Sequence, residues 1–239
     1  MITEKRQDDE LGGIQASEKK ARGAIQVLAV SVGTIGAGLA GMVHGLFSIL
    51  QGNVKPDGFV INPIGPAQQL WPEAALHAIT VILNFLITGI CAMIVGLCVV
   101  IWSSAFLDRK YGARVLFGLS IVLLLVGGGF GSAFLGIVAG LIALGIRKPL
   151  TWWRSHLPKS LGGILARLWP WTLIVYLIFF LTSIVVAICG TPLLWFFSAD
   201  TTYKMLLNLG PISDLILIIA VLTAIAYDIQ QPKGIDPNT

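Results

Sequence analysis

Long apolar runs alternate with short polar segments along the whole chain. A transmembrane helix needs about 20 mostly apolar residues, within a range of about 17–25. Four runs are each long enough to cross a membrane, at 24–50, 75–106, 171–190 and 212–228. We therefore predict an all-α integral membrane protein, built as a helical bundle in which these runs cross the bilayer.

A fifth apolar stretch, 115–146, is 32 residues long, too long for one ordinary span and barely long enough for two. Its centre reads Gly127-Gly128-Gly129-Phe130-Gly131, and glycine both weakens a helix and permits a tight reversal. The pattern leaves two interpretations open, which are a single broken span and a hairpin of 115–127 and 131–146.

The distribution of basic residues favours the hairpin, because Lys and Arg collect in the cytoplasmic segments of membrane proteins. With a hairpin, fourteen of the sixteen Lys and Arg residues lie on one side, and only Lys55 and Lys204 lie on the other. With a single span, the five basic residues of 147–167 change sides. We predict six transmembrane helices in a multi-pass protein of the cell membrane, with a cytoplasmic arm (1–23) and a cytoplasmic tail (229–239).

The segments that flank the spans carry their own signals. The first 23 residues hold ten charges and lack the apolar core of a cleavable signal peptide, so we expect 24–50 to stay as an uncleaved anchor. Segment 150–168 mixes tryptophans with basic residues, which is typical of a helix lying on anionic lipids and also of an ordinary basic loop. Segment 193–209 is rich in aromatic residues, and we expect a short helix in the opposite interface.

Composition supports the membrane assignment and excludes other classes. The chain is 56% hydrophobic and 12% charged, with a mean hydropathy of +0.85. A soluble domain carries about 25% charged residues, so a soluble enzyme, a disordered chain and a disulfide-rich secreted domain are excluded. The basic residues that give a pI near 9.1 are accounted for by membrane topology, and we expect no nucleic-acid partner.

The first span carries a stripe of small residues on one helix face. Its members, spaced by three or four residues, are Ser31, Thr34, Gly38, Gly41, Gly45 and Ser48. Such faces let helices approach closely in lipid, so Gly38, Gly41 and Gly45 predict helix packing, either within the chain or in a homo- or hetero-oligomer. The alternative is that the stripe lines a permeation path.

A polar stripe marks the second run, at the helical spacing of Glu73, His77, Thr80, Asn84, Thr88 and Cys91. On an apolar helix, these side chains must face the interior of the bundle. His44 would lie about 9 Å below the outer end of the first span, at a similar depth. We therefore predict an outward-opening cluster of His44, Glu73, His77 and Asn84.

Three interpretations of this cluster stay open. Its side chains are hydrogen-bonded to neighbouring helices, or they bind a proton or small solute, or they hold Zn(II), Cu(II) or Fe(II). The residues name no particular metal or cofactor. Asp214 and Asp228, at the two ends of the last run, are expected to mark its water boundaries, with Asp214 facing the outer vestibule as the alternative.

The function predicted first is small-solute or ion transport or sensing, or an accessory role in a membrane complex. A structural or assembly subunit without a ligand site is the second hypothesis. A membrane-embedded, metal-dependent enzyme built on the His and Glu cluster is the third. The bilayer itself is the partner common to all of them, with anionic lipids expected at 150–168.

Overall fold

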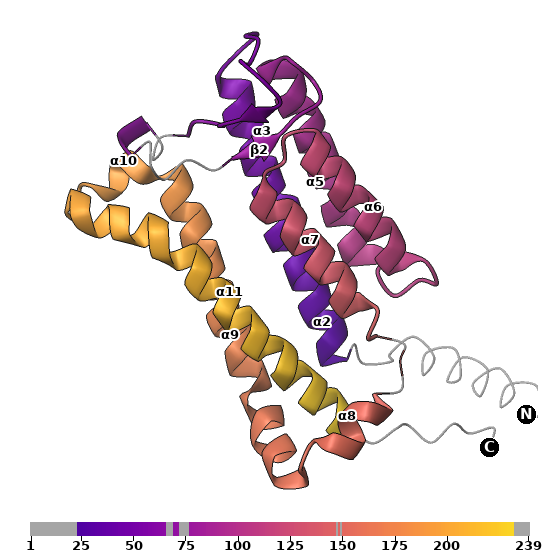
Figure 1. The fold of residues 1–239 in the computed structure, drawn as a ribbon. Coiled ribbons are helices and arrows are strands. Elements are labelled where there is room, and N and C mark those ends of the chain that lie inside the picture. Colours follow the sequence, from indigo (N-terminus) through magenta and orange to yellow (C-terminus); the bar gives the residue numbers. More distant parts are fainter. Residues whose placement is uncertain (1–22, 66–68, 72–76, 147, 149, 232–239) are drawn as a thin grey trace, which may run out of the picture.

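The computed structural model describes residues 23–65, 69–71, 77–146, 148 and 150–231 (Figure 1). The prediction of an all-α fold is confirmed, because most of these residues are helical and the strands among them are two segments of two residues each. Within them, four helices are long and apolar enough to cross a membrane, and two further apolar helices are shorter.

The first long helix, Ala24–Leu50, is the centre of the fold. It comprises α2 (Ala24–Ser31), a π-helical stretch η1 (Val32–Leu39) and α3 (Ala40–Leu50). It packs against α5 (Phe85–Ala105), against α7 (Phe130–Ala143) and, near its beginning, against α11 (Ala199–Gln230). Small side chains on several of its faces make this central position sterically possible.

The apolar stretch at 115–146 forms a helical hairpin of α6 (Gly112–Leu125) and α7. The chain reverses where Gly127 and Gly129 have φ angles of 86° and 89°, in the region that glycine adopts without a steric penalty. Each helix has 14 residues, which corresponds to about 21 Å and is shorter than the ~30 Å hydrocarbon core.

The tip of this hairpin is covered by the cap, which we define as residues 51–65 and 77–84. Strands β1 (Val60–Ile61) and β2 (Ala78–Ile79) pair antiparallel within the cap. Three backbone hydrogen bonds extend the pairing, from Thr80 N to Phe59 O (2.8 Å), from Val81 N to Leu125 O (2.9 Å) and from Phe130 N to His77 O (3.2 Å). The extended segment 77–81 therefore satisfies backbone groups on both sides of the turn, as a low-dielectric environment demands.

The cap corrects the prediction of a helix over 75–106. Helix α5 begins at Phe85, because residues 77–81 are extended and pair with the hairpin tip instead of forming helical hydrogen bonds. Asn84 caps α5, with its Oδ1 accepting from Ile87 N at 3.1 Å. The described residues of the polar stripe before Asn84 therefore do not lie on one face of a helix, because residues 77–84 are not helical.

The second unit is an antiparallel pair of α9 (Lys159–Ile188) and α11, joined through α10 (Gly190–Leu193) and preceded by α8 (Thr151–His156). Parts of 150–168 and 193–209, predicted as separate interfacial segments, are the first turns of these long helices. Pro170 and Pro211 lie inside them, since packing against a neighbour tolerates the hydrogen bond that each proline removes. Figure 1 shows the first turns of α11 bent away from its remainder.

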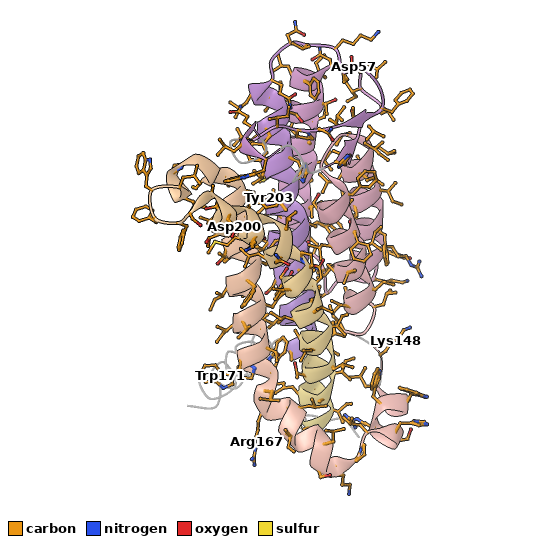
Figure 2. All side chains as sticks on the ribbon, turned by 60° about the vertical axis from the view of Figure 1, so that its left-hand side comes forward. Asp57, Lys148, Arg167, Trp171, Asp200 and Tyr203 are labelled. Carbon is orange, nitrogen blue, oxygen red and sulfur yellow. The ribbon has the colours of Figure 1, made fainter. Side chains whose placement is uncertain are left out.

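The two units are tied together where α2 begins and α11 ends. The Asp228 carboxylate accepts hydrogen bonds from Ala24 N (2.6 Å) and Ile25 N (3.0 Å). The first span therefore starts on the side of the molecule where the last one ends. Figure 2 places Lys148 and Arg167 toward this side, which we call the basic end, and Asp57 at the opposite, capped end.

Candidate functional site

Five buried side-chain polar atoms have no hydrogen-bond partner among the described residues, and all lie on or against the central helix. They are Thr34 Oγ1, His44 Nδ1, Ser48 Oγ, Ser103 Oγ and the Tyr176 hydroxyl. Leaving one such group unpaired costs about 1–3 kcal/mol, so native proteins keep few of them without a reason. Their concentration along one helix marks it as the place to look for a site.

Two of the five lie one turn apart beneath the cap. His44 is 8% exposed, and its imidazole packs against Gly129 so closely that a methyl group on that glycine would overlap the ring. The positive φ angle and missing side chain of Gly129 make this contact possible. His44 Nδ1 and Ser48 Oγ are therefore enclosed polar groups near the hairpin tip.

Ser48 differs from Ser31 and Ser120 in its hydrogen bonding. Ser31 and Ser120 each donate a hydrogen bond to the carbonyl four residues earlier, at 2.9 Å and 2.7 Å. This back-bonding is the usual way in which a helix satisfies a buried serine. Ser48, although fully buried, has no such bond among the described residues, so its hydroxyl is available to another donor or acceptor.

Two buried threonines at the same end are, by contrast, fully paired. Thr80 Oγ1 and Thr88 Oγ1 lie 2.8 Å apart, and both hydroxyls hydrogen-bond to Ile82 O, at 3.2 Å and 2.8 Å. The Thr88 methyl group lies against Gly127 in the turn. These residues of the predicted polar stripe therefore fasten the cap to α5 and the hairpin tip.

Two other members of the predicted cluster, His77 and Asn84, lie in the cap. His77 is exposed, and its carbonyl accepts from Phe130 N beside Gly129, so the backbone of His77 and the side chain of His44 flank the same turn. The Asn84 amide donates to Asn53 Oδ1 at 2.6 Å. Glu73 lies outside the described residues. Within the described residues, no group of three His, Cys, Asp or Glu side chains is placed to hold a metal ion.

A second group of polar atoms lies near the middle of the long helices. A methyl group on Gly36 would lie 3.3 Å from the fully buried Tyr176 hydroxyl. Asp214, an exposed residue of α11, lies near enough to that hydroxyl for an electrostatic interaction, and the described residues show no hydrogen bond between the two. Gly36 is twelve residues after Ala24, which puts it about 18 Å from the basic end. Asp214 is fourteen residues before Asp228, or about 21 Å from the same end.

The structure corrects the expectation that the last helix begins just after Pro211, whereas the expectation that Asp214 marks a water boundary stays a prediction. Helix α11 begins at Ala199 and continues through Pro211, so Asp214 lies well inside it. The sequence suggested a boundary because Gly210 and Pro211 look like a helix start.

The central helix is irregular at this depth. Thr34 and Gly36 lie in η1, and the Oγ of Ser103, a residue of α5, lies against Gly33 of the same stretch. A π-helix replaces i→i+4 hydrogen bonds by i→i+5 bonds, is rare, and is often found at functional sites. The unpaired hydroxyls, the Asp214 carboxylate and η1 together form what we call the mid-membrane group.

The glycines of the first span face two different neighbours. Gly38 and Gly45 oppose Gly96 and Gly89 of α5, because methyl groups built on them would lie 3.1 Å and 2.8 Å from the carbonyl oxygens of those residues. Gly41 instead faces Leu123 of α6. All three are therefore close to other helices of the same chain.

Comparison of the chain with protein-family models, with curated proteins and with solved structures finds no match. The function must therefore be argued from the arrangement of these residues alone.

Proposed function

We propose that this multi-pass protein transports a small solute or ion along its central helix, and that Asp214 is the group that binds the charged species. The observation that carries the proposal is the set of five unpaired buried polar atoms on or against Ala24–Leu50. Polar groups without partners in a membrane interior are costly, and they are typical of a solute or ion pathway.

The mid-membrane group supplies the chemistry for binding. A carboxylate at this depth is expensive unless it is neutralised by a proton, a cation or a partner. Asp214 offers two acceptor oxygens, and the Tyr176 hydroxyl can donate to the carboxylate or to a solute beside it. His44 and Ser48 offer a second pair of polar groups about 12 Å farther toward the capped end, eight residues beyond Gly36.

The position of Asp214 within the fold supports the same function. It lies three residues after Pro211, on the helix pair that is tied to the first bundle at the basic end by Asp228. Transporters often place their sites near the middle of the membrane, between two groups of helices and beside interrupted helices. In the proposed mechanism, α11 bends near Pro211, so that the pair of α9 and α11 moves against the first bundle while the Asp228 contact keeps the basic ends joined.

Flux into liposomes containing the purified protein tests this proposal. Proton uptake driven by a potassium diffusion potential is followed with an internal pH dye, and uptake of water-soluble neutral solutes is followed by light scattering after osmotic shock. We expect flux in at least one assay, and Asp214→Asn should reduce it to near the rate of protein-free liposomes. Asp200→Asn is the matched control, because Asp200 lies on the same helix in an exposed ion pair with Lys204.

Tyr176→Phe separates transport from a structural role. Removing a hydroxyl that has no partner should leave the melting temperature unchanged or slightly raised, while flux falls. Lower stability with unchanged flux would assign Tyr176 to packing alone. Absence of flux above protein-free liposomes in every assay would contradict transport and favour a structural subunit.

A further inference from the structure

A cavity of about 590 Å³ lies at the basic end, between α2, the end of α7, α8 and α11. Its apolar wall includes Ile25, Leu28, Leu141, Val221 and Ile225. Lys148 and Thr151, both exposed, are the lining residues with an ammonium group and a hydroxyl group. The volume falls within the range of about 300–1,000 Å³ that is usual for pockets binding small molecules.

The cavity lies at the level where a bilayer meets water. Ile25 is the second residue of the first span, and the indoles of Trp152 and Trp153 also line the cavity. These two rings meet edge to face, with centroids 5.0 Å apart, and Trp152 is 60% exposed. Tryptophan is enriched at membrane interfaces, because its ring is apolar and its N–H is polar.

Positive charge is concentrated at the basic end, where the cavity lies. Seven basic residues are described at the basic end, namely Arg109, Lys110, Arg114, Lys148, Arg154, Lys159 and Arg167. The described acidic residues there are Asp108 and Asp228, and the Asp228 carboxylate accepts two backbone hydrogen bonds from α2. The charge at this end is therefore complementary to an anionic headgroup.

We propose that the cavity binds one anionic phospholipid, with an acyl chain between α2, α7 and α11 and the phosphate held by Lys148 Nζ and Thr151 Oγ1. The combination of an apolar wall, interfacial indoles and a lysine matches the three parts of such a lipid. Basic pockets between transmembrane helices are known to bind anionic headgroups. This site is separate from the mid-membrane group, and it stands whether or not the protein transports a solute.

Native mass spectrometry of the full-length, delipidated protein tests the proposal. Phosphatidylglycerol and phosphatidylcholine with identical acyl chains are added separately. We expect one phosphatidylglycerol per chain and a clear preference over phosphatidylcholine. Lys148→Ala should weaken phosphatidylglycerol binding about fivefold and abolish the preference, because each lysine or arginine at the headgroup level strengthens the binding of an anionic lipid by about this factor. Lys159→Ala is the matched control, since Lys159 is exposed at the same end without lining the cavity.

A thermal melt gives an independent measurement, because a ligand that binds only the folded protein raises its melting temperature. Phosphatidylglycerol should stabilise the wild type and not Leu141→Trp, in which a larger ring fills the cavity from a position that is 57% exposed. Equal weakening by Lys148→Ala and Lys159→Ala would overturn the proposal in favour of diffuse attraction to the basic surface. Equal binding of both lipids, or displacement by inorganic phosphate, would overturn it as well.

Discussion

Asp228 joins the two ends of the membrane domain through a single side chain. Its carboxylate takes the place of an N-cap residue for α2, although it is 203 and 204 residues away from its partners in sequence. Gly23 stands at the N-cap position itself and has no side chain to offer, so the carboxylate can approach closely. A carboxylate at a helix N-terminus is also favoured by the helix dipole.

We expect Asp228→Ala to lower the free energy of unfolding by about 1–2 kcal/mol, because two N–H groups lose their acceptor. Asp228→Asn should cost less, since the amide keeps one acceptor oxygen. Unfolding of the purified protein, followed by tryptophan fluorescence, measures both. The control is Asp200→Ala, whose ion pair is 69% exposed on the aspartate side and should matter little. Equal, small effects of Asp228→Ala and Asp200→Ala would show that the cap does not stabilise the fold.

At the scale of helices, the closest packing is between the first span and α5. Gly38 and Gly45 on one helix, and Gly89 and Gly96 on the other, are each seven residues apart, and they meet in antiparallel order. Such spacing brings two glycines onto one face after two turns, so both helices present a flat surface. The sequence indicated a small face on the first span, and the matching spacing in α5 identifies its neighbour.

Gly89→Ala should destabilise the protein by about 1–3 kcal/mol, because the new methyl group would lie 2.5 Å from Gly45 O and the backbones must separate. Gly118→Ala in α6 is the matched control, since nothing lies within 4 Å of its added methyl group. The melting temperature of the two variants in detergent measures the difference. If Gly118→Ala destabilised the protein as much as Gly89→Ala, the close approach of the two helices would be contradicted.

The apolar pattern was sufficient to predict the long helices, because a helix that lies in lipid must be apolar in composition. The hairpin was predicted only when the distribution of basic residues was added to the glycines at 127–131. The apolar pattern was insufficient at 77–84. There the chain is apolar enough to be helical, yet it pairs with a hairpin tip that is distant in sequence. Such pairing depends on tertiary contacts and leaves no local periodicity.

The candidate site was predictable only in part for the same reason. His44 was identified from its place in an uncharged span, and Asp214 was linked to the same outer vestibule only as an alternative, whereas Tyr176 was not singled out. Their proximity depends on how α9 and α11 pack against the first bundle. Helix continuation through Pro211 also depends on that packing, so the local sequence pattern wrongly predicted that the last helix begins after Pro211.

On the scale of the whole molecule, charge and geometry indicate the same topology. The contact between Asp228 and the start of α2 requires an even number of crossings between Ala24 and Asp228. Four long helices and the α6–α7 hairpin provide that number. With Lys and Arg concentrated at the basic end, the positive-inside rule predicts that this end faces the cytoplasm.

Site-directed cysteine labelling is the most direct test of this topology. The transport and lipid proposals both depend on it. Single cysteines are placed at Asp57, Lys204, Lys110 and Lys159 after replacement of the native Cys91, Cys98 and Cys189. We predict that a membrane-impermeant maleimide reaches Asp57→Cys and Lys204→Cys in intact cells, and reaches Lys110→Cys and Lys159→Cys only after permeabilisation. Labelling of Lys110→Cys and Lys159→Cys from opposite sides of the membrane would mean that the α6–α7 region crosses once, and would contradict the account.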